Sequence, residues 1–182
     1  MYDYIPNRQN QKARVVVLCL ALGAAAAFFG SAYLPAYPAI LQAIGLALLV
    51  PLIQITGRYL VLHYLYRLRE RDDGQVDFEV YSYRGGTRMQ LICRVGLDEI
   101  VATAPLSAEN KRPPAKMRRY SYLPDIAPAR ATVVSVRNQD GDCELLLAPD
   151  EHIDGVLAAA AARYRECHGE ESLAARGGSE QE

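Results

Sequence analysis

The sequence lacks charge near its beginning: the stretch from Val15 to Gly57 contains no Asp, Glu, Lys or Arg. Pro35 and Pro38 divide this stretch into two halves. Each half is about as long as the roughly 20 apolar residues that cross a hydrocarbon core. The sequence therefore predicts an N-terminal transmembrane helical hairpin with spans at Val15–Leu34 and roughly Pro38–Gly57.

Residues that build catalytic and metal sites are also scarce. The chain has three His, none beside a plausible nucleophile or at a metal-ligand spacing such as HxxxH. Its four Cys show no CxxC spacing, which argues against a zinc site and a disulfide framework. We therefore expect no enzyme activity, no metal and no cofactor. The formal net charge of -1 gives no indication of a nucleic-acid partner.

Trp, a common residue of membrane interfaces, is absent from the chain. Tyrosines can form the interfacial belt in its place. Those flanking the predicted spans are Tyr33, Tyr37, Tyr59, Tyr64 and Tyr66.

Basic residues flank the uncharged stretch on both sides, whereas the turn between the spans has no charge. Lys12 and Arg14 precede the first span, and the second is followed by Arg58, Arg67, Arg69 and Arg71. Cytoplasmic flanks carry an excess of Lys and Arg, so we predict a multi-pass protein of the cell membrane with both termini cytoplasmic. Cleavage of the first span as a signal peptide, near the small residues at 30–32, is the alternative.

Small residues recur every fourth position in both predicted spans. They are Gly23, Ala27 and Ser31 in the first span, and Ala39, Ala43 and Ala47 in the second. This spacing lets two helix backbones approach closely. It indicates packing of the hairpin on itself or, alternatively, a homo-oligomer interface.

The remainder of the chain is rich in β-strand patterns. Residues 58–67 either extend the second helix or begin the first strand. Apolar and polar residues alternate over 76–81 and again over 89–95, around a glycine-containing turn at 84–87. Further strands are expected at 120–123, 132–136 and 143–147, and 98–101 is a helical turn or a strand. We divide the chain into a cytoplasmic tail (1–14), the hairpin (15–65), a β domain with a C-terminal helix (66–168) and a disordered acidic tail (169–182).

The closing helix begins after Pro149, where Asp150 can cap it and Glu151 suits the positive end of the helix dipole. Its apolar residues recur at helical spacing. They are Ile153, Val156, Leu157, Ala160, Ala161 and Tyr164.

A basic segment, 107–119, interrupts the strand pattern, and Pro113 and Pro114 preclude a helix there. Its five cations are Lys111, Arg112, Lys116, Arg118 and Arg119. The segment is either a solvated insertion or a contact with anionic lipid headgroups, worth about 1 kcal/mol per basic residue near the surface. A nucleic-acid contact is disfavoured, because the domain is tethered at the membrane.

The order of a membrane hairpin, short strands with hairpin turns and one closing helix resembles the bacterial pleckstrin-homology-like (PH-like) membrane proteins. The residues that carry the resemblance are the 78–95 hairpin, the 130–147 hairpin and the helix start at 148–151. The resemblance implies an α+β fold in which an antiparallel β-sandwich or barrel is closed by the helix. It also implies a non-catalytic binding or scaffolding module with an unknown protein partner. The alternative is a subunit of a larger membrane complex or transport system whose transmembrane helices are the working part.

Overall fold

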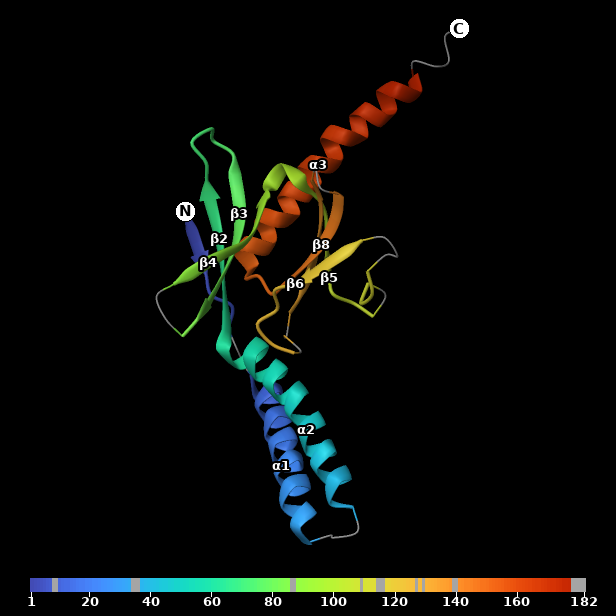
Figure 1. Ribbon diagram of the computed structural model, residues 1–182. Coiled ribbons are helices and arrows are strands. Elements are labelled where there is room, and N and C mark those ends of the chain that lie inside the picture. Colours follow the sequence, from blue (N-terminus) through green and yellow to red (C-terminus); the bar gives the residue numbers. More distant parts are fainter. Residues whose placement is uncertain are drawn as a thin grey trace.

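The computed structural model describes residues 1–7, 10–33, 37–85, 88–108, 110–113, 117–126, 128, 130–138 and 141–177. It shows an α+β protein in which two long helices project from a β domain (Figure 1). The inter-helix turn at 35–36 and parts of the turns at 84–87 and 138–141 lie outside the described residues.

The two projecting helices are α1 (Gln11–Tyr33) and α2 (Pro38–Ile55), and α2 continues as a π-helical segment, η1 (Thr56–Val61). Gly45 of α2 allows close contact, since a Cβ there would lie 2.9 Å from the ring of Phe28. Ala24 and Ala27 of α1 are buried. The helices therefore pack against each other through small residues.

The first sheet has the order β1-β2-β3-β4 and all its pairs are antiparallel. Its strands are β1 (Tyr2–Tyr4), β2 (Leu62–Glu70), β3 (Val76–Arg84) and β4 (Met89–Gly96). The chain thus passes directly from η1 into β2 at Leu62, so residues 58–67 form the end of the helix and the start of a strand. The β domain begins earlier than residue 66.

The second sheet has the order β5-β7-β8-β6. It contains β5 (Ile100–Pro105), β6 (Arg118–Ser121), β7 (Thr132–Asn138) and β8 (Gly141–Leu147), and a 3-10 turn, η2 (Leu97–Glu99), precedes β5. β6 pairs with β8 in parallel, because the basic segment carries the chain across the sheet. Among the described residues the two sheets do not join into a closed barrel.

The helix α3 (Glu151–Gly177) packs against the sheets and then extends beyond them (Figure 1). Asp150 caps it as predicted, since its Oδ1 accepts a hydrogen bond of 2.9 Å from the backbone N–H of Ile153. α3 continues through residues 169–177 of the predicted acidic tail, and 178–182 lie outside the described residues. Disorder of this tail stays a prediction.

The hydrophobic core lies between the two sheets and the first half of α3. Tyr66, Phe78, Leu145, Ile153 and Leu157 are among its fully buried members, and no residue of α1 or α2 belongs to it. The Tyr66 hydroxyl donates to the carbonyl of Tyr122 at 2.8 Å and accepts from the N–H of Ala148 at 3.2 Å. This side chain therefore ties the first sheet to the ends of β6 and β8.

Candidate functional site

The basic segment contains one cation that is held inside the structure. Arg119 forms an ion pair with Glu144 at 2.6 Å, and the side chains are only 9% and 8% exposed. Its Nη1 donates to the carbonyl oxygen of Lys111 at 2.7 Å, and Nη2, which also contacts Glu144, donates to that of Asn110 at 2.8 Å. Arg119 thus holds the segment to β8, and Glu144 compensates its charge. Contact of Arg119 with anionic lipid stays a prediction.

The other cations of the segment differ from Arg119. Lys111, Arg112 and Arg118 are exposed, whereas Lys116 lies outside the described residues. The connection from β5 to β6 lies in the half of the domain nearer the helices (Figure 1). These three exposed cations remain candidates for contact with an anionic surface.

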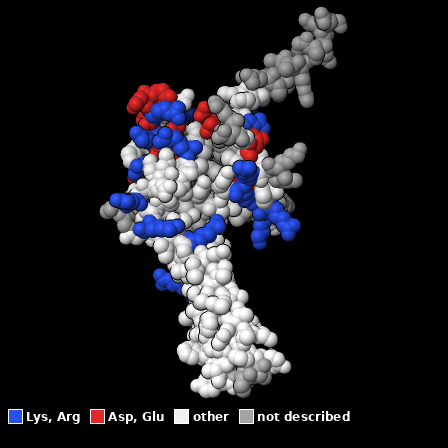
Figure 2. Space-filling model, in the orientation of Figure 1, with Lys and Arg blue, Asp and Glu red and all other residues white. Residues whose placement is uncertain are grey.

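A second set of cations lies where the helices join the domain. Lys12 and Arg14 belong to the first turn of α1, Arg58 belongs to η1, and Arg84 pairs with Leu62, the first residue of β2. In Figure 2, Lys and Arg side chains lie around the base of the domain, whereas the visible Asp and Glu lie toward the opposite end, together with further Lys and Arg. The end of the domain that adjoins the apolar helices is therefore positive.

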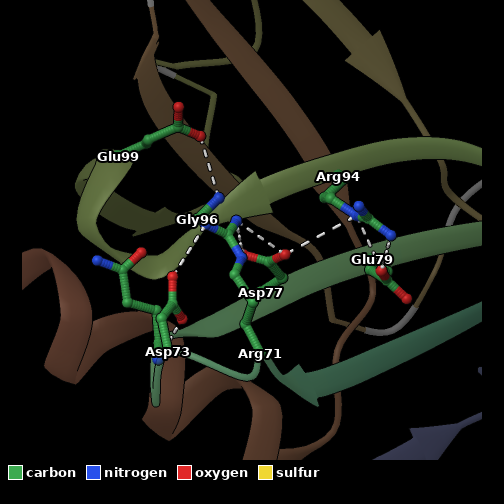
Figure 3. A network of polar contacts seen from close by, with 8 residues as sticks. Arg71, Asp73, Asp77, Glu79, Arg94, Gly96 and Glu99 are labelled. Carbon is green, nitrogen blue, oxygen red and sulfur yellow. Dashed lines mark hydrogen bonds and ion pairs between the residues drawn. The ribbon is translucent and has the colours of Figure 1, made fainter.

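Charged side chains on the outer face of the first sheet pair with one another (Figure 3). Glu79 is fully buried. Its carboxylate forms an ion pair of 2.6 Å with Arg94 and accepts a hydrogen bond of 2.8 Å from the Tyr81 hydroxyl. Asp77 accepts from Arg71 at 2.8 Å. Burial raises the pKa of Glu79, but the bonds from Tyr81 and Arg94 outweigh it, so the pKa lies below the ordinary value. The network is internally compensated, and it stabilises the sheet.

The N-terminal tail is part of the domain, which the sequence did not indicate. Tyr2–Tyr4 pair with Tyr66–Leu68. Tyr2 also hydrogen-bonds to Asp150 and lies edge-on to His152, with ring centroids 4.6 Å apart. The tail is therefore joined to both the first sheet and the start of α3.

A pocket of about 460 Å³ lies at the end of the domain away from the helices, between α3, η2 and the turn after β2. Val76, Leu97 and Val156 give it an apolar wall. Asp98, Arg163 and Tyr164 stand at the same pocket. This combination of an apolar wall and a few polar groups is typical of a binding site.

The histidines pack against tyrosines. His63 stacks on Tyr83 at a centroid distance of 4.9 Å, and His168 stacks on Tyr164 at 4.0 Å. Within the part of the chain that the structure describes, no three His, Cys, Asp or Glu side chains are grouped to hold a metal ion.

Comparison with family models, with curated proteins and with solved structures finds no match for this chain. The resemblance to PH-like membrane proteins therefore rests on the order of the elements alone.

Proposed function

We propose that the chain is an integral membrane protein whose two helices anchor a cytoplasmic, non-catalytic binding or scaffolding domain. The observation that carries this proposal is that α1 and α2 contribute nothing to the core of the domain. Only 11% and 6% of their most apolar windows are buried, with mean hydropathy of 2.3 and 2.0. A core helix of a soluble protein would be mostly buried. Location in the hydrocarbon core of a membrane therefore explains the exposed apolar surfaces of α1 and α2 best.

The energetic argument follows from side chains such as Leu22, Phe29 and Ile53, which are 62%, 73% and 67% exposed. Removing such a side chain from water is worth about 1.5–3 kcal/mol. With many such side chains on both helices, insertion into a bilayer is strongly favoured over exposure to water.

The pairing of β1 with β2 supports the hairpin topology. It requires residues 2–4 and the domain to lie on the same side of the two helices. Removal of the first span as a signal peptide would delete β1 and its contacts with Arg67 and Asp150. The basic flanks support a cytoplasmic location for that shared side.

Two features of the domain support a binding role. The pocket lined by Val76, Leu97 and Val156 faces away from the helices and could accept a protein partner. Lys111, Arg112 and Arg118 could contact anionic headgroups. The layout also agrees with the PH-like resemblance, in which the domain binds and does not catalyse.

A second candidate function is that of a subunit of a larger membrane complex, or of a homo-oligomer, in which the helices make the contacts. One observation favours it. Gly23 and Ala27 of α1 face α2, but Ala39, Ala43 and Ala47 of α2 are exposed. Packing of the hairpin therefore uses only one of the two small-residue stripes.

Copurification of the full chain from detergent-solubilised membranes tests these candidates through two matched Ala→Trp substitutions. Ala159→Trp fills the pocket, and Ala43→Trp blocks the exposed stripe of α2. A stoichiometric partner lost with Ala159→Trp and retained with Ala43→Trp supports the binding domain. The reverse pattern supports the subunit role and contradicts our proposal.

A further inference from the structure

The end of the β3–β4 hairpin lies next to the end of the second helix. Leu62, the first residue after η1, pairs with Arg84, and His63 pairs with Tyr83. Tyr83 in turn pairs with Met89 at the start of β4. Figure 1 shows this end of the hairpin directed toward the helices. Residues 84 and 88–89 are therefore level with the point where the chain leaves the second helix.

The first half of β4 exposes apolar side chains. Met89, Leu91 and Ile92 are 52%, 40% and 37% exposed, and the register with β3 shifts between Leu91 and Cys93. β4 is also an edge strand of its sheet. Native proteins usually cover or charge such an edge, so an exposed apolar one indicates a contact surface.

Distances along the strand place this surface at the depth of lipid headgroups. A headgroup layer is about 5–8 Å thick, half the difference between the full bilayer and its hydrocarbon core. Met89 is level with His63 across the sheet, which is one residue, or about 3.3 Å, further along β2 than Leu62. Leu91 is level with Leu65, which is about 10 Å from Leu62. If the second span ends at Val61, Met89, two residues further along in register or about 6.6 Å, lies inside the layer, and Leu91 lies beyond its outer edge.

The charges near this end are of one sign. Arg84 and Arg88 flank the turn, and Arg58 precedes Leu62 by one turn of η1. Residues 56–62 and 83–92 contain no Asp or Glu. At the other end of β2 and β3, the turn instead contains Asp72 and Asp73. The turn that joins β3 and β4, toward the helices, is thus positive, and the turn that joins β2 and β3, away from the helices, is acidic. Contact with an anionic bilayer requires this arrangement.

We propose that the end of the β3–β4 hairpin is a second membrane contact. Met89 inserts among the headgroups of an anionic bilayer, and Arg84 and Arg88 bind lipid phosphates. The contact orients the domain relative to the membrane and covers the apolar edge of β4. This proposal rests on the proposed anchoring of the two helices, but it concerns a surface outside the spans and outside the basic segment.

The absence of Trp from the chain provides a direct test. A single Trp is introduced into the full chain at position 89, and the protein is reconstituted in bilayers of phosphatidylglycerol and phosphatidylcholine brominated near the headgroup end of the acyl chains. Asp72→Trp, at the opposite turn, is the matched exposed control. Leu46→Trp, on the exposed face of α2, reports insertion of the helix itself and is read with bromines near the acyl-chain ends.

We expect several-fold stronger quenching of Met89→Trp than of Asp72→Trp. Adding Arg84→Gln and Arg88→Gln should reduce the quenching of Met89→Trp in anionic bilayers. Quenching of Leu46→Trp without quenching of Met89→Trp would overturn this proposal and leave the anchor intact, whereas no quenching of Leu46→Trp would contradict the anchor itself. Blue-shifted but unquenched emission of Met89→Trp would show that this residue is buried away from lipid. That result would indicate that a strand of another protein covers the edge of β4, and it would also overturn the proposal.

Discussion

Asp3 of β1 and Arg67 of β2 form a bidentate ion pair, in which Nε and Nη2 of Arg67 each lie 2.7 Å from an oxygen of the Asp3 carboxylate. The guanidinium carbon of Arg67 also lies 5.0 Å from the ring centroid of Tyr81 in β3. One arginine therefore connects the residues before the first helix to the strands after the second. The pair joins the two chain segments that enter and leave the helical hairpin.

Acid should weaken this connection. The hydrogen bond from Arg67 lowers the pKa of Asp3. A lowered pKa in the folded state gives stability that is present above the unfolded value, near 3.9, and is lost as the pH falls through the folded value. Stability of the domain in detergent micelles should therefore decline below about pH 4. Asp3→Asn should cost about 0.5–1 kcal/mol at neutral pH, because the pair is partly exposed, and should flatten the acid decline. An unchanged acid profile in Asp3→Asn would contradict this assignment.

The polar network on the outer face of the first sheet predicts a large contribution of Glu79 to stability. The alternating sequence pattern at 76–81 instead assigns Glu79 to the exposed face. Glu79→Gln removes the negative charge that faces Arg94, while the shape stays the same. Because Arg94 is 47% exposed and can be partly solvated, we expect a loss of about 1–3 kcal/mol in unfolding free energy. Asp142→Asn, which breaks the exposed pair with Arg137, is the control and should cost less than about 1 kcal/mol. Equal effects of the two substitutions on denaturant unfolding would show that the network adds no more stability than an exposed ion pair.

Arg119 and Arg112 are neighbours in one basic segment but should behave differently. Arg119→Gln leaves Glu144 buried without its cation, so we expect a loss of about 3–5 kcal/mol. Arg119→Lys should not restore stability, since one ammonium cannot reproduce contacts with Glu144, Lys111 and Asn110. Arg112→Gln should change stability by no more than about 0.5 kcal/mol. Thermal unfolding of the three variants separates the structural cation from the exposed one; full stability of Arg119→Gln would contradict the account.

The packing of α3 gives a prediction that is independent of charge. Leu157 is fully buried between the sheets, so Leu157→Ala should cost about 2–5 kcal/mol. Ala158→Ser, on the exposed side of the same helix, should have a small effect. Protease resistance of the domain should fall only in Leu157→Ala, while retention of both variants in the membrane pellet after alkaline extraction stays unchanged. Undiminished protease resistance in Leu157→Ala would show that α3 does not close the core.

The sequence could predict the elements whose own residues repeat with a clear period. The two apolar helices, the alternating strands such as Val76–Arg84 and the capped start of α3 at Asp150 are of this kind. In the strands and in α3 the local pattern and the tertiary environment agree, because the apolar face is the face that packs. The two helices near the N-terminus are predicted by the length and composition of their apolar runs alone.

Features that depend on distant partners could not be predicted. Tyr2–Tyr4 is too short to show a strand period, and its partner strand lies beyond both helices. Nothing in the basic segment distinguishes Arg119 from Arg118, because the difference is the buried Glu144 on another strand. The two small-residue stripes are equivalent in sequence, yet only the one on α1 faces the other helix. Parallel pairing of β6 with β8 likewise follows from a crossover that no local pattern specifies.

The central claim is that the two helices cross a membrane as a hairpin with the β domain on the cytoplasmic side. Alkaline phosphatase, which is active only outside the cytoplasm, tests it when fused after Tyr37, between the helices, and in a second chain after the last residue. The account predicts an active enzyme after Tyr37 and an inactive one at the C-terminus. An inactive enzyme at both positions would show that the helices do not cross the membrane, and an active one at the C-terminus would place the domain on the opposite side.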